Sequence, residues 1–180
     1  VLAIGAETNY FDIPGLREYS LPMKSFMDAI AIRDRVLTRY EEGGVLRIVV
    51  GGGGSTGVEL AGELQEWFAE LRAKTHPART PTVTIIEGAP AILSGFAPGI
   101  ATKAAARLSR LGVALMTNER ITSADASSVT IQSGRTVPYD VLIWTGGVKA
   151  AALMSALPLK REARGRVEVL AGLQCVPHTA

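Results

Sequence analysis

The sequence predicts an α/β fold in which helices pack on a parallel β-sheet and a short antiparallel β-meander interrupts the alternation. Apolar segments of four or five residues, the length of fully buried strands, recur along the chain. Between them lie longer segments in which apolar residues repeat at helical spacing. The order of strand, helix, strand, helix, strand, meander and strand is typical of a parallel sheet covered by helices.

The first elements are a short strand at residues 1–4 and a helix at residues 23–40. The strand ends at Gly5 and is followed by a segment of turn and extended character. The helix is predicted because apolar residues recur along it, and a pair of glycines ends it. One face of the helix carries Phe26, Ile30, Arg33 and Leu37.

The central elements are a buried strand at residues 47–51 and a helix at residues 56–74. The strand (RIVVG) runs directly into GGGSTG, so a glycine-rich turn joins it to the helix. One face of this helix carries Ala61, Leu64, Phe68 and Leu71. Residues 75–81 (THPARTP) contain two prolines and are predicted to be a loop.

The last part of the chain supplies the remaining strands. A helix is expected at residues 99–111, and the strands are expected at residues 83–87, 113–116 and 141–144. Alternating residues and turn signals over residues 120–138 predict the antiparallel meander. Beyond residue 150 the pattern is less regular, with a turn at residues 164–166 and a short strand at residues 167–169.

Charge and composition exclude several classes of protein. The formal net charge is +2 and no stretch concentrates lysine and arginine, so the basic stripe that nucleic-acid binding requires is missing. The two histidines, His76 and His178, are too far apart in sequence to suggest a metal site. The one cysteine, Cys175, cannot form an internal disulfide, which fits a reducing compartment and leaves a catalytic thiol as the less favoured alternative.

The chain shows no targeting or membrane segment. No apolar run approaches the ~18 residues expected of a membrane span, and the opening VLAIGAETN lacks the basic first region of a signal peptide. The opening also lacks an initiator methionine and resembles the middle of a longer protein. We therefore expect a cytoplasmic chain.

The glycine turn carries the main functional signal. Gly52, Gly54 and Gly57 form a GxGxxG pattern that follows an apolar strand and opens a long helix, which is the context of a Rossmann-type dinucleotide site. The first glycine permits the tight turn, the second lets backbone approach a pyrophosphate, and the third allows close packing of helix on strand. Ser55 and Thr56 complete the helix N-terminus that faces the phosphates. The alternative is a glycine-rich turn without a ligand.

An acidic residue, Glu87, ends the second apolar strand, where this fold places the carboxylate that binds the adenine ribose. It follows Gly52 by 35 residues instead of the usual ~20, which an insertion in the preceding loop explains. No lysine or arginine comes just after Glu87 and Gly88. A 2′-phosphate ~4 Å from the carboxylate would cost roughly 4 kcal/mol at an effective dielectric of 20, so NAD(H) is favoured over NADP(H). The alternative is an exposed carboxylate at a strand end.

Three segments, GGGSTGVELAGEL, VTIIEGAPAILSGF and YDVLIWTGGVKA, together resemble the two-dinucleotide-binding flavoproteins of the FAD-dependent pyridine nucleotide-disulphide oxidoreductase family. Within it, the chain is most similar to the type II NADH dehydrogenases (NADH:quinone oxidoreductases), from its start to about Val169. The resemblance implies an FAD domain interrupted by an NAD domain. Residues 1–22 would be an FAD-domain remnant and exit turn, residues 23–150 the NAD-binding domain, and residues 151–180 the return toward the FAD domain.

The resemblance also assigns site residues. Glu59 matches a glutamate near the nicotinamide, although the helix dipole alone also stabilises a glutamate at this place. Leu93 and Phe96 match a segment that borders the site, with core packing as the alternative. A strand-end turn that faces NAD is matched by Thr145, Gly146 and Gly147. This sequence has glycine at 146 where the family more often has alanine, and Ser55 where it has proline.

The implied activity is that of a flavin-dependent NADH dehydrogenase, in which hydride passes from NADH to FAD and on to a quinone. The chain has no second GxGxxG, so alone it is expected to bind NAD(H) but not FAD, and to be inactive. Its expected partners are the rest of the FAD domain in cis and a quinone. A homodimer and peripheral attachment at the inner face of a membrane are compatible with the resemblance. The alternatives are another FAD-dependent NADH reductase, with rubredoxin, ferredoxin or a small oxidant as acceptor, and a non-catalytic NAD-sensing module.

Overall fold

The computed structural model describes residues 1–75, 81–162 and 165–176. They fall into two compact units, one from Tyr10 to Gly146 and the other combining the first nine residues with the segment from Gly147 onward. Several sequence expectations lie outside the described residues: most of the proline-containing loop, the start of the turn at residue 164, and both histidines.

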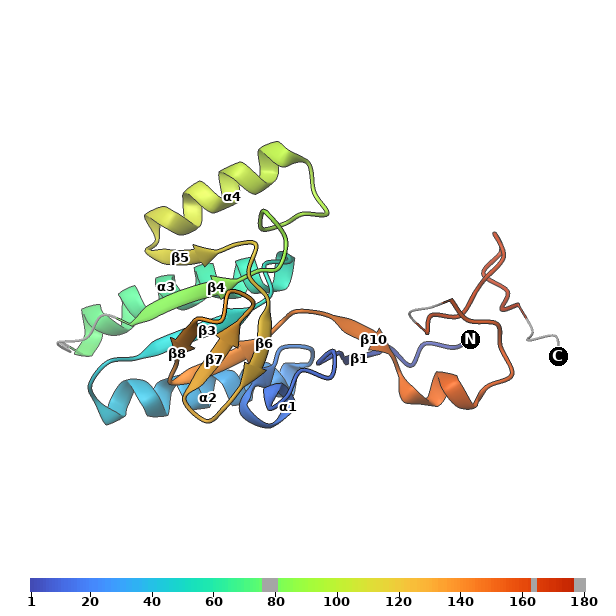
Figure 1. Ribbon diagram of the computed structural model, residues 1–180, viewed down its shortest axis with the longest axis horizontal. Coiled ribbons are helices and arrows are strands. Elements are labelled where there is room, and N and C mark those ends of the chain that lie inside the picture. The colour runs from blue at the N-terminus through green and yellow to red at the C-terminus, as the bar shows by residue number, and fades with distance from the viewer. Residues whose placement is uncertain (76–80, 163–164, 177–180) are drawn as a thin grey trace. The chain divides into compact units, whose positions relative to one another are not determined.

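A parallel sheet of five strands forms the centre of the Tyr10–Gly146 unit (Figure 1). The strands lie in the order β2, β9, β3, β4 and β5, and all neighbouring strands run parallel. Their bounds are Leu21–Pro22 for β2, Val141–Trp144 for β9, Arg47–Gly51 for β3, Thr82–Ile86 for β4 and Val113–Met116 for β5. All but β2 coincide with apolar segments of the sequence, and the predicted parallel sheet is confirmed.

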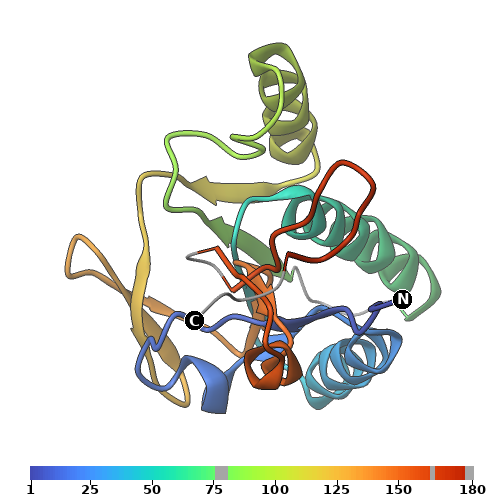
Figure 2. The same ribbon diagram turned by 90° about the vertical axis from the view of Figure 1, so that its right-hand side faces the viewer.

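Helices cover one face of this sheet. They are α2 at Phe26–Glu42, α3 at Ser55–Thr75 and α4 at Pro98–Arg110. Alternation along β3 sends Ile48 and Val50 toward the helices, where both join Phe68 of α3 in one buried cluster. The ring of Phe68 stacks against Tyr40 and Trp67, with ring centroids 6.0 Å apart in both pairs. These contacts hold α2 and α3 side by side on the sheet (Figure 2).

An antiparallel meander covers the opposite face of the sheet (Figure 1). It consists of β6 at Ile121–Ala124, β7 at Ser128–Ile131 and β8 at Thr136–Pro138. Val129 and Ile131 are buried against Val49 and Leu142 of the parallel sheet. Because Val49 alternates with the helix-facing residues of β3, this strand contributes to both clusters. The predicted meander is confirmed, and it adds a third layer to the fold.

Helix α2 follows a capping box. Ser25 Oγ accepts the Asp28 N–H at 3.2 Å, and the Asp28 carboxylate accepts the Ser25 N–H at 2.7 Å. The buried stripe of the helix is Ile32, Val36 and Tyr40. These residues are four apart at each step and therefore share one face. Phe26, on another face in the first turn, is 78% exposed.

The segment before α2 carries two elements that the sequence pattern did not predict, the short helix α1 at Leu16–Tyr19 and the strand β2. Leu16 is fully buried in the cluster beneath the meander, and β2 pairs with β9. The compact unit therefore starts at Tyr10, upstream of the expected boundary at residue 23. Both elements are too short to show a period. The assignment of the units to FAD and NAD domains stays a prediction.

The other unit contains one two-stranded pairing. β1 at Ala6–Thr8 runs antiparallel to β10 at Val148–Ala150. The Ala152 N–H, in the 3-10 helix that follows β10, donates to the Glu7 carboxylate at 2.8 Å. The prediction of a strand at residues 1–4 was wrong, because the residues that pair with β10 are those of β1.

The strand predicted at residues 167–169 is reduced to isolated bridges. Val167 pairs with Arg161, and Val169 pairs with Cys175. The Cys175 thiol is free and half-buried. This segment therefore has local antiparallel contacts without a continuous ladder.

An ion pair between Arg47 and Asp140 joins the amino-terminal ends of β3 and β9. The Asp140 carboxylate accepts the Arg47 N–H at 2.8 Å and its guanidinium at 3.0 and 3.1 Å. The Asp140 N–H in turn donates to the Arg47 carbonyl at 2.8 Å. Hydrogen bonding from the Arg47 side chain is the main reason that the pKa of Asp140 lies below its ordinary value.

Replacing Asp140 with asparagine should lower the free energy of unfolding by about 1 kcal/mol at pH 7, because it weakens a charge-assisted but partly exposed contact. The depressed pKa means that the carboxylate contributes stability above its unfolded pKa of roughly 3.9 and loses it as the pH falls through the folded value. Urea denaturation should therefore show a smaller difference from wild type near pH 3.5 than near pH 7.

The control for this prediction is Asp34→Asn, which removes the exposed pair between Asp34 and Arg33. It should change the free energy of unfolding by less than about 0.5 kcal/mol. A difference between Asp140→Asn and wild type that grows on acidification would contradict the assignment.

Candidate nucleotide-binding site

The glycine turn lies at the carboxyl edge of the parallel sheet. β3 ends at Gly51 and α3 begins at Ser55. On one side the Gly52 N–H donates to the Ile86 carbonyl at 2.9 Å, and on the other the Thr145 N–H donates to the Gly51 carbonyl at 2.8 Å. From β3 the chain continues to β4 and β5 on one side, and β9 returns on the other. The turn therefore occupies the switch point where open α/β sheets form their ligand crevice.

The glycines of the turn meet different surroundings. Gly52 has a φ of 110°, in the region that favours glycine. A Cβ atom at Gly57 would lie 2.0 Å from the Gly52 carbonyl oxygen and 2.7 Å from Thr145 Oγ1, so only glycine allows this approach of helix to strand. A Cβ atom at Gly54 would meet nothing within 4 Å. The geometry gives Gly57 a packing role, whereas the open space beside Gly54 is room for a ligand.

The first turn of α3 presents backbone donors that the described residues do not use. The Val58 N–H donates to the Gly54 carbonyl at 3.0 Å and so starts the helical ladder. For the N–H groups of Ser55, Thr56 and Gly57, the described part of the chain offers no acceptor. The side chains of Ser55 and Thr56 are exposed. This end of the helix is therefore built to receive an anion.

Glu87 follows β4 directly, and its carboxylate is bound to the glycine turn. One oxygen accepts the Gly53 N–H at 2.6 Å and the other accepts the Ala89 N–H at 2.7 Å. An ionised carboxylate offers about four acceptor positions, so these two bonds leave capacity for ribose hydroxyls. The carboxylate thus shapes the turn, and the ribose contact predicted for it remains a prediction.

A cavity of about 430 Å³ opens beside Gly52 and Glu87. Aromatic and aliphatic side chains, among them Phe11, Ile121 and Trp144, form its apolar part. Its polar part includes Glu119 and Arg120. The sequence pattern missed the arginine, because it lies 33 residues beyond Glu87 and reaches the cavity only through the pairing of β4 with β5.

The turn after β9 contacts the glycine turn from the other side. Thr145 Oγ1 donates to the carbonyls of Gly51 and Gly52 at 3.1 Å each. A Cβ atom at Gly146 would lie 2.4 Å from two ring atoms of Trp144, so the ring fills the space that a side chain would need here. Gly147 belongs to the other compact unit, so its predicted contact with NAD remains untested.

Leu93 and Phe96 take different positions in the loop that follows Glu87. Leu93 is buried, and its N–H donates to the Gly53 carbonyl at 2.8 Å, so the loop supports the glycine turn through backbone. Phe96 is 52% exposed at a separate, mainly apolar cavity. Glu59 is exposed on α3 and does not line the cavity beside Glu87. Its predicted place near the nicotinamide remains a prediction.

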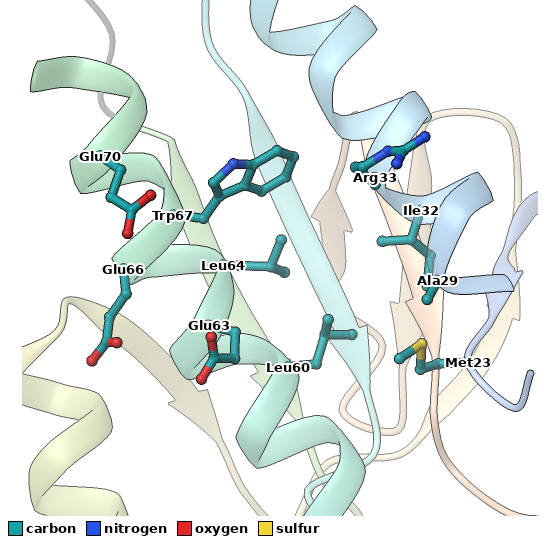
Figure 3. Close-up of a pocket in the computed structure, with 10 residues that line it drawn as sticks. All are labelled: Met23, Ala29, Ile32, Arg33, Leu60, Glu63, Leu64, Glu66, Trp67 and Glu70. Carbon is teal, nitrogen blue, oxygen red and sulfur yellow. The ribbon is translucent and has the colours of Figure 1, made fainter. Parts of the chain in front are cut away.

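A second groove of about 430 Å³ lies between α2 and α3, on the helix side of the sheet (Figure 3). Figure 3 shows side chains of α3 such as Leu64 and Trp67 facing Ile32 of α2. None of its lining residues belongs to the glycine turn. Elsewhere in the described ranges, no acidic, histidine and cysteine side chains gather in a metal-binding group, and no helix has the length and apolar character to cross a membrane.

Comparison with known proteins gives the relatives of this chain. It is 31% identical over 195 residues to the type II NADH:quinone oxidoreductase Ndh of Mycobacterium tuberculosis, a match that covers 96% of this chain and 42% of the relative. It is also 29% identical over 189 residues to the mitochondrial external alternative NAD(P)H-ubiquinone oxidoreductase B4 of Arabidopsis thaliana. This match covers 95% of the present chain and 32% of the relative.

Among solved structures, NDH2 from Plasmodium falciparum in complex with NADH matches with a TM-score of 0.80 at 25% identity, covering 93% of this chain and 38% of that one. The chain thus spans less than half the length of these relatives. A family model, pyridine nucleotide-disulphide oxidoreductase, matches residues 1–178. Since that match extends over nearly the whole chain, the protein belongs to the pyridine nucleotide-disulphide oxidoreductase family, as its three sequence segments predicted.

Proposed function

We propose that this chain is the NAD(H)-binding part of a flavin-dependent NADH dehydrogenase that passes hydride from NADH to FAD and on to a quinone. The observation that carries the proposal is the turn between β3 and α3, where exposed backbone lies beside Glu87 at the edge of a cavity. Relatives named as NADH:quinone and NAD(P)H-ubiquinone oxidoreductases, and a neighbour solved with NADH, support it.

Each part of the turn has a chemical task in this proposal. The N–H groups at the start of the 21-residue helix α3 donate to the pyrophosphate, and the positive end of the helix adds a favourable field. Gly54 leaves space for phosphate oxygens to approach the backbone. Glu87 accepts from the ribose hydroxyls with the lone pairs that Gly53 and Ala89 do not use. Gly88 lines the same cavity as Glu87.

The nicotinamide end is assigned to residues farther along the turn and helix. Glu59 is exposed near the start of α3, where its carboxylate can accept from the carboxamide N–H of nicotinamide. Thr145 and Gly146 end β9 against the glycine turn and so border the path of the nucleotide. The contact of Gly147 with NAD stays a prediction.

The chain's own share of the reaction is to bind and orient NADH, because hydride and electron transfer are chemistry of the cofactors. FAD does not fit this chain alone, since its single GxGxxG turn is taken by the nicotinamide nucleotide. We assign the flavin, the quinone site and any attachment to a membrane surface to the further length that the relatives possess. A reductase of rubredoxin, ferredoxin or a small oxidant would use the same NAD site, and assays with each acceptor distinguish it.

Gly54→Ala should weaken NADH binding by about tenfold or more, because the added methyl group displaces phosphate oxygens from charge-assisted bonds worth roughly 1.5–3 kcal/mol. The fold should be unaffected, since a Cβ atom there meets nothing within 4 Å. Isothermal titration calorimetry gives the affinity, and thermal denaturation should show a midpoint within about 2 °C of wild type.

The matched control is Gly99→Ala on α4, another glycine whose Cβ position is open and which lies away from the turn. It should bind NADH like wild type. NADH binding by Gly54→Ala with unchanged affinity would contradict the proposal, as would a failure of the wild-type chain to bind NADH.

Glu87→Gln should raise the affinity for NADPH relative to NADH by about tenfold, because it removes the repulsion between the carboxylate and a 2′-phosphate. The estimate is well below the roughly 4 kcal/mol of two charges ~4 Å apart, since this site is partly exposed to solvent. Calorimetric titration with both nucleotides measures the ratio. Glu70→Gln, on the exposed side of α3, is the control and should leave the ratio unchanged. An unchanged ratio in Glu87→Gln would show that this carboxylate does not face the ribose.

A further inference from the structure

Arg120 brings a cation to the place where the proposed site binds the adenosine ribose. A Cβ atom at Gly88 would lie 2.8 Å from Arg120 Cγ and 3.0 Å from its Nε, so the arginine side chain crosses directly over this glycine. Gly88 follows Glu87 in the chain, and Glu87, Gly88 and Arg120 line the same cavity. Among the described residues that line it, Arg120 is the only one with a positive charge.

The backbone holds Arg120 in this position. The Asn118 N–H donates to the Ala89 carbonyl at 2.9 Å, and the Glu119 N–H donates to the Glu87 carbonyl at 3.0 Å. The Arg120 carbonyl accepts the Gln132 N–H of the meander at 2.8 Å. The segment after β5 is therefore joined to the segment after β4, which fixes the backbone of Arg120 close to Gly88.

The guanidinium is available for a ligand. The nearby carboxylates are engaged with backbone: Glu87 binds the amides of Gly53 and Ala89, and Glu119 accepts the Ser133 N–H at 3.1 Å. Within the described ranges, no carboxylate lies within ion-pair distance of Arg120. Its side chain is exposed at the mouth of the cavity.

NADH and NADPH differ by one phosphate on the adenosine ribose. Glu87 disfavours that phosphate, whereas an arginine binds phosphate oxygens with paired, charge-assisted hydrogen bonds. We propose that Arg120 is a specificity-determining residue that offsets Glu87, so that the site prefers NADH but also binds NADPH with reduced affinity. This inference rests on the proposed NAD(H) site and names the residue that sets its selectivity.

Arg120→Gln tests the proposal while retaining most of the side-chain stem that packs over Gly88. It should weaken NADPH binding about tenfold, equivalent to roughly 1.4 kcal/mol, and NADH binding less than about twofold. Calorimetric titrations with both nucleotides measure the effect of Arg120→Gln in the wild-type chain and in the Glu87→Gln variant. In the Glu87→Gln variant, we expect NADPH to bind tightly enough for a tenfold loss of affinity to be measured. Arg110→Gln at the exposed end of α4 removes the same charge elsewhere and should change neither affinity.

A second measurement separates charge recognition from stacking or structural effects. Adenosine 2′,5′-bisphosphate and adenosine 5′-monophosphate differ only in the 2′-phosphate, so Arg120→Gln should weaken the first and spare the second. If Arg120→Gln weakened NADH and NADPH equally, or the adenosine bisphosphate and monophosphate equally, the proposal would be overturned. Such a result would indicate stacking on adenine or damage to the fold. No change in Arg120→Gln, or no NADPH binding by wild type, would overturn it as well. If wild type binds no NADH, the proposed function itself fails.

Discussion

The hydrogen bond between the Glu87 carboxylate and the Gly53 N–H, 2.6 Å long, is the contact on which the site depends. It joins the carboxyl ends of β4 and β3, and it gives a backbone donor in the glycine turn a charged partner. The same carboxylate binds Ala89 and thereby shapes the loop that carries Gly88. One side chain thus sets the geometry of the turn and supplies the negative charge at its edge.

The layers of the fold keep this contact in place. The sheet orders its strands so that β3 lies between β4 and β9, and the turn after β3 is held from both sides by backbone bonds. Helices bury one face of the sheet and the meander buries the other, so β3 is buried from Ile48 to Gly51. A rigid strand end is what lets exposed amides face a ligand without collapsing onto their own chain.

The strand order places a negative charge, Glu87, and a positive charge, Arg120, at the same cavity. Glu87 ends one strand and Arg120 follows the next, and parallel pairing places both strand ends at the same edge of the sheet. In our proposal, Glu87 and Arg120 act in opposite directions on the binding of two nucleotides that differ by a single phosphate. The sequence argument for the cofactor preference used only the segment after Glu87, and our proposal adds Arg120, which only the fold brings near.

Local patterns in the sequence determined the parallel sheet, the meander and the turn at Gly52, because burial and helical periodicity act over a few residues and leave a regular signal. The same signal does not decide which face of α2 is buried: contact with the sheet buries Ile32, Val36 and Tyr40 and leaves Phe26 exposed. Tertiary structure alone decided that Arg120 lies over Gly88 and that Trp144 fills the space beside Gly146. The position of Arg120 follows from strand order and register, and the position of Trp144 follows from packing in the folded unit. Neither depends on a residue spacing that a sequence pattern could reveal.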